Sequence, residues 1–283
     1  MPAKNIKSVH QRITIGYWLT QSIDKLAING IRNPRLDCLV MMEDVTKKNK
    51  SHLLANLNTE LTKDQQVQLG KMLDRRFNRE PLAYIRGFKE FYGINFQVNP
   101  DVLIPRPETE DIIDIIENIK LAPDATILDV GTGSGNIAIT IASRNKLLRV
   151  SATDISSKAL QTAKINAKLN NAKIDFIQSD LLKNVDGQFD VIVANLPYVS
   201  KRIPTEPELK LEPSTAIFAE QDGLDLILKL IDQIYAKNIL ANSGWLIIES
   251  HSHQHQEIAD YCSRFGLKLR QTTNLIQAFQ LTM

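Results

Sequence analysis

The chain is poor in cysteine, since only Cys38 and Cys262 occur among its 283 residues. They lie far apart and show no metal-ligand spacing, so we predict neither a disulfide framework nor a cysteine-based zinc site. No apolar run reaches the eighteen or more residues of a transmembrane helix, and residues 1–5 lack the apolar centre of a signal peptide. These absences predict a cytoplasmic protein without membrane association.

A strong net charge is also absent, because 34 Lys and Arg are balanced by 32 Asp and Glu. The charge is uneven, however. Residues 1–90 contain sixteen basic and nine acidic side chains, a net charge of +7. Residues 91–283 contain eighteen basic and twenty-three acidic side chains, a net charge of −5. The basic front is either an ordinary solvated helical surface or a module that docks an acidic protein or RNA, and the charge alone does not choose between these.

Hydrophobic patterning divides the chain into three segments. Residues 1–80 have apolar side chains at helical spacing and predict a small helical domain. Residues 81–100 have aromatic side chains that alternate around Gly87 and Gly93, which predicts a β-hairpin linker. The third segment comprises residues 101–283. The whole chain is 43% hydrophobic and long enough to bury a sizeable core.

Strand-like and helix-like stretches alternate from Pro123 onward, which predicts an open α/β sheet with helices on both faces. Residues 245–249 are expected to form a fifth strand. Residues 267–269 and 278–281 are expected to finish the sheet as an antiparallel pair.

A glycine-rich loop, residues 129–135 (DVGTGSG), lies between a strand-like and a helix-like stretch. Its third glycine comes one residue earlier than the dinucleotide pattern G-x-G-x-x-G requires, which favours S-adenosylmethionine. Asp154 ends the next strand, where a carboxylate can accept both ribose hydroxyls. Asp180 ends a further strand and is placed to accept the adenine amino group, with Leu181 beside the ring. The predicted cofactor-binding residues are Gly131, Thr132, Gly133, Ser134, Gly135, Asp154, Asp180, Leu181 and Asn195.

Residues 195–198 (NLPY) end the apolar run 189–194. An amide nitrogen is a poor nucleophile because its lone pair is delocalised into the carbonyl. If the side-chain oxygen of Asn195 and the carbonyl of Leu196 each accept one N–H, the lone pair is directed toward a sulfonium methyl group, and the acceptors stabilise the charge that develops. Tyr198 can pack flat against a planar amide or base. The predicted catalytic and substrate-holding residues are Asn195, Leu196, Pro197 and Tyr198.

Residues 79–87 (REPLAYIRG), 90–93 (EFYG) and 102–110 (VLIPRPETE), joined to NLPY, resemble the linker and signature of the bacterial glutamine N5-methyltransferases of peptide-chain release factors. The similarity covers about residues 10 to 260 and implies a seven-stranded, Rossmann-like class I methyltransferase sheet behind a helical substrate-recognition domain. It also implies S-adenosylmethionine as cofactor and the glutamine of a Gly-Gly-Gln sequence in a class 1 release factor as substrate. We expect a monomer, and we do not expect nucleic-acid binding, although the sequence leaves it open. The resemblance places Arg106, Pro107 and Thr109 at the border of the substrate pocket.

The chain departs from this family at several positions. Leu196 replaces a usual proline, but leucine also offers a carbonyl and remains biased to extended geometry before Pro197. Within residues 249–254 (ESHSHQ), His251 replaces a glycine. Near the C-terminus, where the family usually has Asp, Gly and Arg, this chain has Asn274, Gln277 and Gln280.

The sequence leaves other functions open. On a strand, His251, His253 and His255 would share one face, but zinc usually needs a fourth ligand, so we predict loop histidines and no metal. The acceptor could instead be a glutamine of a ribosomal protein, or the N6 amino group of an adenine flipped onto Tyr198. A non-catalytic binding module is opposed by the intact Asn195 and glycine loop.

Overall fold

The computed structural model describes residues 12–200 and 206–282. The chain forms two compact units, Met1–Arg86 and Gly87–Met283. We expected the helical segment to end at residue 80, but it extends to 86. The reason is a short helix, α5 (Leu82–Arg86), whose Arg86 forms an ion pair of 2.6 Å with Asp44 of the helical unit.

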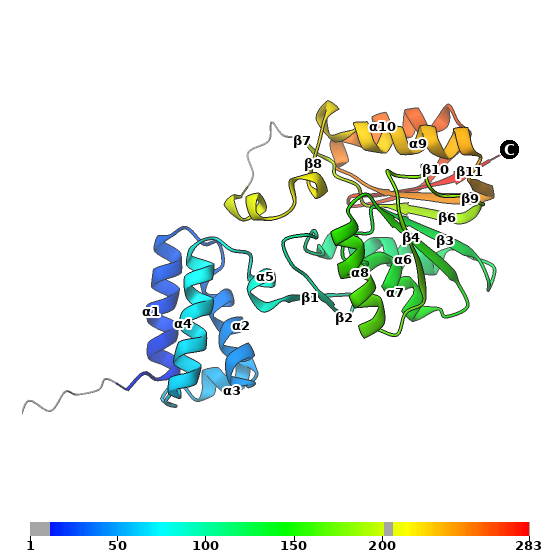
Figure 1. Cartoon of the computed structure of the whole chain (residues 1–283). Helices are drawn as coiled ribbons and strands as arrows, with labels where there is room; N and C mark the ends of the chain where they lie inside the picture. Colours follow the sequence, from blue (N-terminus) through cyan, green and yellow to red (C-terminus); the bar gives the residue numbers. More distant parts are fainter. Residues whose placement is uncertain (1–11, 201–205, 283) are drawn as a thin grey trace, which may run out of the picture. The chain divides into compact units, whose positions relative to one another are not determined.

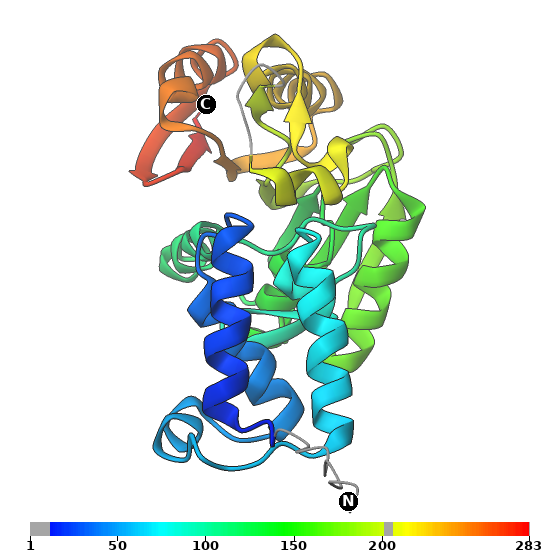
Figure 2. The same cartoon turned by 90° about the vertical axis from the view of Figure 1, so that its left-hand side faces the viewer.

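The first unit is helical, as predicted, and Figure 2 shows two of its helices, dark blue α1 and cyan α4, side by side. Before α5 it contains α1 (Ile15–Ile28), α2 (Pro34–Thr46), α3 (Lys50–Ala55) and α4 (Lys63–Phe77). Trp18, Met41 and Met42 are buried in its core. A buried ion pair of 2.7 Å between Asp37 and Arg76 joins α2 to α4.

The second unit contains the predicted seven-stranded sheet, with strand order β10-β11-β9-β6-β3-β4-β5. Its strands are β3 (Thr126–Val130), β4 (Arg149–Asp154), β5 (Ile174–Gln178), β6 (Phe189–Ala194), β9 (Leu240–Glu249), β10 (Leu267–Thr273) and β11 (Ile276–Leu281). Neighbours among β9, β6, β3, β4 and β5 are parallel, whereas β11 is antiparallel to both β9 and β10. The predicted final antiparallel pair is therefore confirmed.

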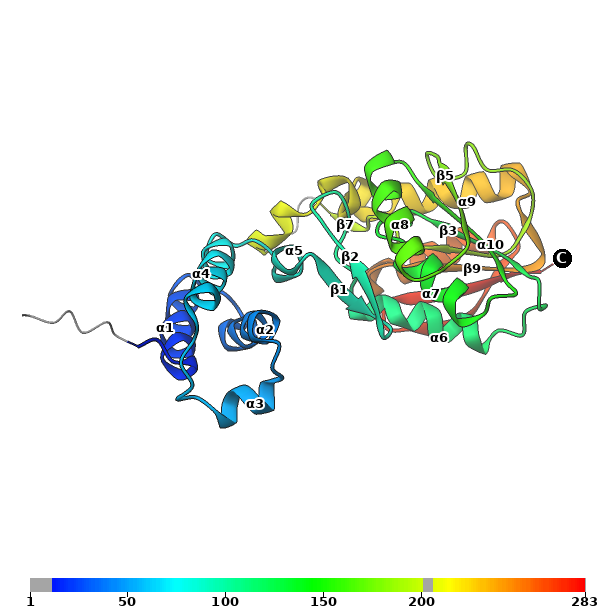
Figure 3. The ribbon, with the colours of Figure 1, turned by 60° about the horizontal axis from the view of Figure 1, so that its bottom comes forward.

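Helices cover both faces of this sheet (Figures 1 and 3). One face is covered by α6 (Glu110–Asn118), α7 (Asn136–Arg144) and α8 (Ser157–Leu169), and the other by α9 (Asp225–Lys237) and α10 (His255–Ser263). Strand side chains alternate between two cores: Ile127 and Val191 pack with α6 and α7, whereas Leu128 and Ile192 pack with α9. Within residues 12–200 and 206–282, no helix is long and apolar enough to cross a membrane.

The predicted β-hairpin is present and packs as part of the second unit. It consists of β1 (Phe88–Phe91) and β2 (Ile94–Gln97). Phe91 and Phe96 enter the core beside α6. The fully buried Asn166 of α8 accepts the Gln97 N–H at 2.7 Å and donates to the carbonyls of Gln97 and Ser134 at 3.0 and 2.8 Å. One side chain thus joins the hairpin, α8 and the glycine loop.

Candidate active site

The carboxyl ends of the parallel strands meet at one edge of the sheet, and the predicted site residues follow directly after them. Ala194 of β6 pairs with Ile248 of β9. The next residues along the two strands are Asn195 and Glu249, so they lie side by side. The register therefore brings a motif asparagine next to an acidic residue 54 positions further along the chain.

A cavity of about 500 Å³ opens at this edge, which is within the range of about 300–1,000 Å³ for small-molecule sites. Most of the predicted cofactor residues line it, and so do three residues of the NLPY motif, of which Asn195 belongs to both groups. The predicted residues in its wall are Gly131, Gly133, Asp154, Asp180, Leu181, Asn195, Leu196 and Pro197. Thr132, Ser134 and Gly135 do not line it and instead hold the loop in place.

The glycine loop needs glycine for steric reasons. Gly131 has φ +78°, and a Cβ there would lie 2.9 Å from the Cδ2 atom of Leu196. A Cβ at Gly133 would meet no atom within 4 Å, because this glycine borders the cavity. Beneath the loop, Thr132 donates its hydroxyl to Asp129 at 2.6 Å, and burial raises the pKa of Asp129 to about 7. The open side of the loop leaves room for a ligand against its backbone.

Asp154 is held by two backbone groups. It accepts the N–H of Gly133 at 2.9 Å and the N–H of Ser156 at 2.8 Å through different carboxylate oxygens. Burial is the largest influence on its pKa and raises it. The N–H of Ile155 also favours its charged form, and because a carboxylate has about four acceptor sites, it can still accept a hydrogen bond from a ligand.

Asp180 lines the same cavity, but its carboxylate is engaged by two lysines. Lys229 donates to both oxygens at 3.0 Å, and Lys183 lies 2.7 Å from one of them. These hydrogen bonds lower the pKa of Asp180. An adenine amino group would therefore share this acceptor with two ammonium groups, which the sequence pattern did not indicate.

The side chain of Asn195 is fixed by its amide nitrogen. That nitrogen donates to the hydroxyl of Thr109 and to Oε2 of Glu249, each at 3.0 Å. A carboxylate only accepts, so the NH2 group must face Glu249 and Oδ1 must point elsewhere. No described residue donates to this Oδ1. The arrangement presents the oxygen that the predicted chemistry requires as an acceptor.

Glu249 is almost completely buried at the end of β9. Its Oε1 accepts the Tyr198 hydroxyl at 2.8 Å, while Oε2 accepts from Asn195. Burial raises the pKa of Glu249, and the hydrogen bonds from Thr109, Tyr198 and Asn195 oppose this rise. Burial and the Glu249 charge raise the pKa of Tyr198, which keeps the phenol protonated.

A second cavity of about 200 Å³ lies on the other side of the NLPY motif. It shares Leu103, Asn195, Leu196, Pro197 and Ala216 with the first cavity. Tyr198, Arg106, Glu249 and His251 line it beyond this shared wall. The two cavities therefore meet at the motif, as expected where a methyl donor faces an acceptor.

The wall of the second cavity depends on an ion pair. Arg106 lies 2.5 Å from Glu212, whose other oxygen accepts the Ile104 N–H at 3.0 Å. Glu212 thus joins the loop before η1 (Pro107–Thr109) to the segment that follows the NLPY motif. Thr109 is buried against Asn195, but Pro107 is exposed and lines neither cavity.

Tyr198 is held from its backbone as well. Its carbonyl accepts the side-chain amide of Gln254 at 3.1 Å, and the same amide donates to the Asp222 carbonyl at 2.7 Å. Gly223, with φ +92°, packs so closely that a Cβ would lie 2.0 Å from the Tyr198 carbonyl oxygen. The His251 ring stands edge-to-face with Tyr198 at 4.8 Å between centroids.

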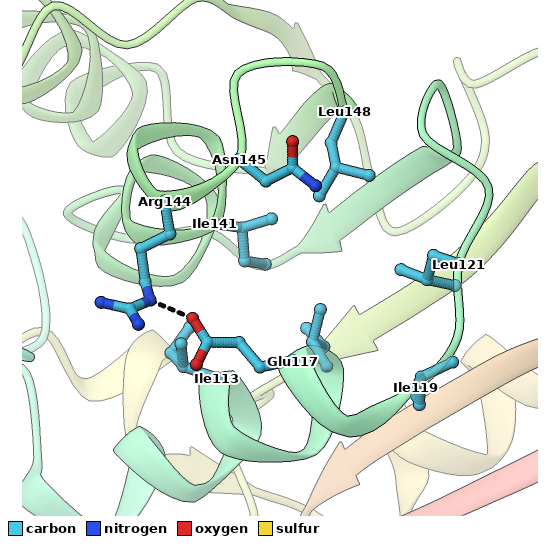
Figure 4. A pocket seen from close by; sticks show the side chains of 9 residues that line it. Ile113, Glu117, Ile119, Leu121, Ile141, Arg144, Asn145 and Leu148 are labelled. Carbon is cyan, nitrogen blue, oxygen red and sulfur yellow. Dashed lines mark hydrogen bonds and ion pairs between the residues drawn. The ribbon is translucent and has the colours of Figure 1, made fainter.

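A third cavity, of about 410 Å³, lies between α6 and α7 (Figure 4). Its wall is mainly isoleucine and leucine, with an ion pair between Glu117 and Arg144 at one side. It contains none of the predicted site residues and shares no lining residue with the other two cavities.

Sequence reasoning missed some residues that build the site. Glu249 ends a strand, as Asp154 does, and this signal could have identified it. Glu212 and Asn166 gave no local signal, because their partners are distant in the sequence. Those of Glu212 are 106 and 108 positions away, and those of Asn166 are 32 and 69 positions away. The three histidines do not lie on a strand, because His251 to His255 span the turn η5 (Ser252–Gln254) and the start of α10.

Comparisons with known proteins agree with this geometry. Residues 17–87 match the family model described as PrmC N-terminal domain, and residues 114–209 match the Methyltransferase small domain. A release factor glutamine methyltransferase of Aliivibrio fischeri is 33% identical over 260 residues, which is 90% of each chain. This chain belongs to the release factor glutamine methyltransferase family. A second member, from Coxiella burnetii, is 38% identical over 84% of this methyltransferase and 87% of its own length.

A solved structure supports the fold of this family member. A methyltransferase from Pyrococcus furiosus aligns with a TM-score of 0.53 at 17% identity, over 78% of this chain and 100% of that one. At this identity the likeness concerns the fold alone. The predicted class I methyltransferase sheet is thereby confirmed.

Proposed function

We propose that this methyltransferase transfers a methyl group from S-adenosylmethionine to the side-chain N5 of the glutamine in the Gly-Gly-Gln sequence of class 1 release factors. The observation that carries the proposal is the fixed amide of Asn195. Its nitrogen is bound by Thr109 and Glu249, so its Oδ1 is presented where the two cavities meet. An oxygen held in this way accepts one N–H of a primary amide.

The larger cavity fits S-adenosylmethionine, which supplies an electrophilic methyl group when bound. The open side of Gly133 admits the ligand against the loop, and Asp154 can still accept a hydrogen bond from the ribose diol. Leu181 offers an apolar wall to the adenine.

In the smaller cavity, Asn195 and the Leu196 carbonyl would each accept one N–H of the glutamine. This orientation turns the lone pair of N5 toward the larger cavity. The Tyr198 ring would pack against the amide plane, and Glu249 would keep Asn195 and Tyr198 in place. The basic helical unit would bind the release factor away from the glutamine.

The test is mass spectrometry of a purified release factor incubated with this methyltransferase and S-adenosylmethionine. We expect the Gly-Gly-Gln peptide to gain one methyl group, and a release factor with Asn in place of that Gln to gain none. Asn195→Ala is the matched enzyme control. Methylation of only a ribosomal protein, or of only an adenine-containing oligonucleotide, would overturn the proposal and support the corresponding alternative.

A further inference from the structure

The cavity between α6 and α7 is separate from the active site and is lined mainly by apolar side chains (Figure 4). Its volume of about 410 Å³ is well over twice the roughly 150 Å³ of an apolar cavity that binds benzene. Water has few polar partners in such a cavity, so an apolar ligand that displaces it gains free energy. The apolar lining residues are Ile113, Ile116, Ile119, Leu121, Ile141 and Leu148.

The polar groups at the edge of this cavity determine which ligand fits. The charges of Arg144 and Glu117 neutralise each other, and the Arg144 guanidinium also lies 4.9 Å from the centroid of the Tyr92 ring. Asn145 accepts the Leu147 N–H through Oδ1 at 3.1 Å. Its Nδ2 therefore faces another way, and no described residue accepts a hydrogen bond from it. An amide donor without a partner and a lining without net charge fit a neutral ligand with one acceptor.

The two helices connect this cavity to the active site. α6 directly follows Thr109, whose hydroxyl accepts the amide of Asn195 at 3.0 Å. α7 directly follows Gly135, the last glycine of the cofactor loop. Each helix has nine residues and is only about 13 Å long. Because packed interiors transmit strain, a ligand that contacts the later turns of both helices also affects the groups at their beginnings.

We propose that this cavity binds a neutral compound of two fused rings with one hydrogen-bond acceptor, and that its occupancy changes the affinity for S-adenosylmethionine. The rings lie among the isoleucines, and Asn145 donates to the acceptor. The coupling is reciprocal, so S-adenosylmethionine changes the affinity for the cavity ligand by the same factor. It involves the cofactor site and not the methyl acceptor, and it is therefore independent of the proposed function.

Coumarin is the probe, because it has two fused rings, no charge and a carbonyl acceptor. It is titrated into the full chain labelled at the isoleucine δ1 methyl groups, and the methyl resonances are followed by NMR. Each resonance is assigned by its loss in an Ile→Val variant. We expect saturable shifts for Ile113, Ile116 and Ile141, with a Kd of about 1 mM or below. Ile165, on the exposed surface of α8, should not shift.

Three variants test the position and the polarity of the site. Ile119 lies across the cavity from Arg144, so Ile119→Trp fills the space and should abolish the shifts (Figure 4). Ile165→Trp is the matched control at an exposed isoleucine and should leave them unchanged. Asn145→Ala removes only the donor, at an exposed position, and should raise the Kd for coumarin about 3- to 10-fold. This last variant tests the site even if Ile119→Trp does not fold.

Calorimetry measures the coupling. With saturating coumarin, the Kd for S-adenosylmethionine should change by at least about fivefold in the wild type and in Ile165→Trp, and not in Ile119→Trp. The change should reach a plateau, whereas an apparent Kd that rises without limit shows competition at the cofactor site and overturns the coupling. Absent or unsaturable methyl shifts, shifts that persist in Ile119→Trp, or an unchanged Kd for coumarin in Asn145→Ala overturn the site. Methyl shifts with protein concentration alone show that a second copy covers the cavity, and they overturn it as well.

Discussion

At the scale of single residues, the catalytic geometry depends on the hydrogen-bond partners of Asn195 rather than on Asn195 alone. An isolated asparagine can present either its oxygen or its NH2 group. Here Thr109 and Glu249 both bind the nitrogen, so only one orientation satisfies all three side chains. Glu249 is therefore a positioning residue in this account.

The first prediction concerns this positioning. Glu249→Gln replaces one acceptor oxygen by an NH2 group. The side-chain amide of Asn195 then loses its charged partner or flips, so that its oxygen and nitrogen exchange places. We expect kcat to fall by about 10- to 150-fold, as for loss of a hydrogen bond to a charged group worth roughly 1.5–3 kcal/mol. Affinity for S-adenosylmethionine, measured by calorimetry, should change little. Tyr198→Phe, which removes a donor to Glu249 but leaves Asn195 bound, should cost less; equal losses in both variants would contradict the role.

The second prediction concerns Asp154. Its carboxylate can still accept a hydrogen bond from a ligand after bonding to Gly133 and Ser156. If the ribose diol donates this bond, Asp154→Ala should raise the Kd for S-adenosylmethionine about tenfold or more, because a charge-assisted bond contributes roughly 1.5–3 kcal/mol. Calorimetric titration measures this, and an unchanged Kd would limit Asp154 to supporting the loop.

The third prediction concerns Leu196, where the chain departs from its family. Its buried side chain packs over Gly131, which the sequence did not indicate, while its carbonyl is the group that we propose binds the substrate amide. Leu196→Pro keeps the carbonyl and should preserve methylation. Leu196→Ala should also retain turnover but lower the free energy of unfolding by about 2–5 kcal/mol. Steady-state rates and urea unfolding measure these effects; loss of turnover in both variants with unchanged cofactor affinity would show that the leucine contacts substrate.

At the scale of elements, the hairpin, α8 and the glycine loop form one unit through Asn166. This side chain binds three backbone groups, two of Gln97 in partly buried hydrogen bonds and the carbonyl of Ser134 in a buried one. Elements far apart in the sequence are thus coupled by one amide.

The fourth prediction follows from this coupling. Asn166→Ala leaves the buried carbonyl of Ser134 unpaired and exposes the two partly buried groups of Gln97 to water, so the free energy of unfolding should fall by about 1–3 kcal/mol. The Kd for S-adenosylmethionine should rise because Ser134 belongs to the glycine loop. Asn170→Ala, at the partly exposed C-cap of the same helix, is the control. Equal unfolding midpoints for the two variants in urea would contradict the coupling.

The strands and helices could be predicted because each depends on local pattern. Alternation of Ile127 and Leu128 between two cores is visible in the sequence, as are the turn residues of the hairpin. The end of the helical unit was misplaced because α5 depends on a partner, Asp44, that is 42 positions away. Glu212 was missed for the same reason: its role arises only when the chain returns to Arg106.

At the scale of the whole molecule, the front of the chain keeps its positive net charge, because each ion pair within it joins one basic and one acidic side chain. Ion pairs within the described helical unit neutralise several of its basic residues. These pairs are Arg12 with Glu60, Lys25 with Asp74, Arg75 with Glu80, Arg76 with Asp37 and Arg86 with Asp44. The remaining positive charge does not choose between a solvated surface and a docking surface, and it does not specify the reaction, which we propose depends on the site at the sheet edge.

The central claim is that the methyl acceptor is an amide nitrogen held by Asn195. The most direct test is to methylate a release factor with radiolabelled S-adenosylmethionine, isolate the Gly-Gly-Gln peptide and hydrolyse it in acid. An N-methyl amide releases methylamine, whereas a methyl ester releases methanol. We predict that the label is recovered as methylamine from this peptide and that Asn195→Ala lowers the yield by about 100- to 1,000-fold. Label recovered as methanol, or from a different peptide, would contradict the account.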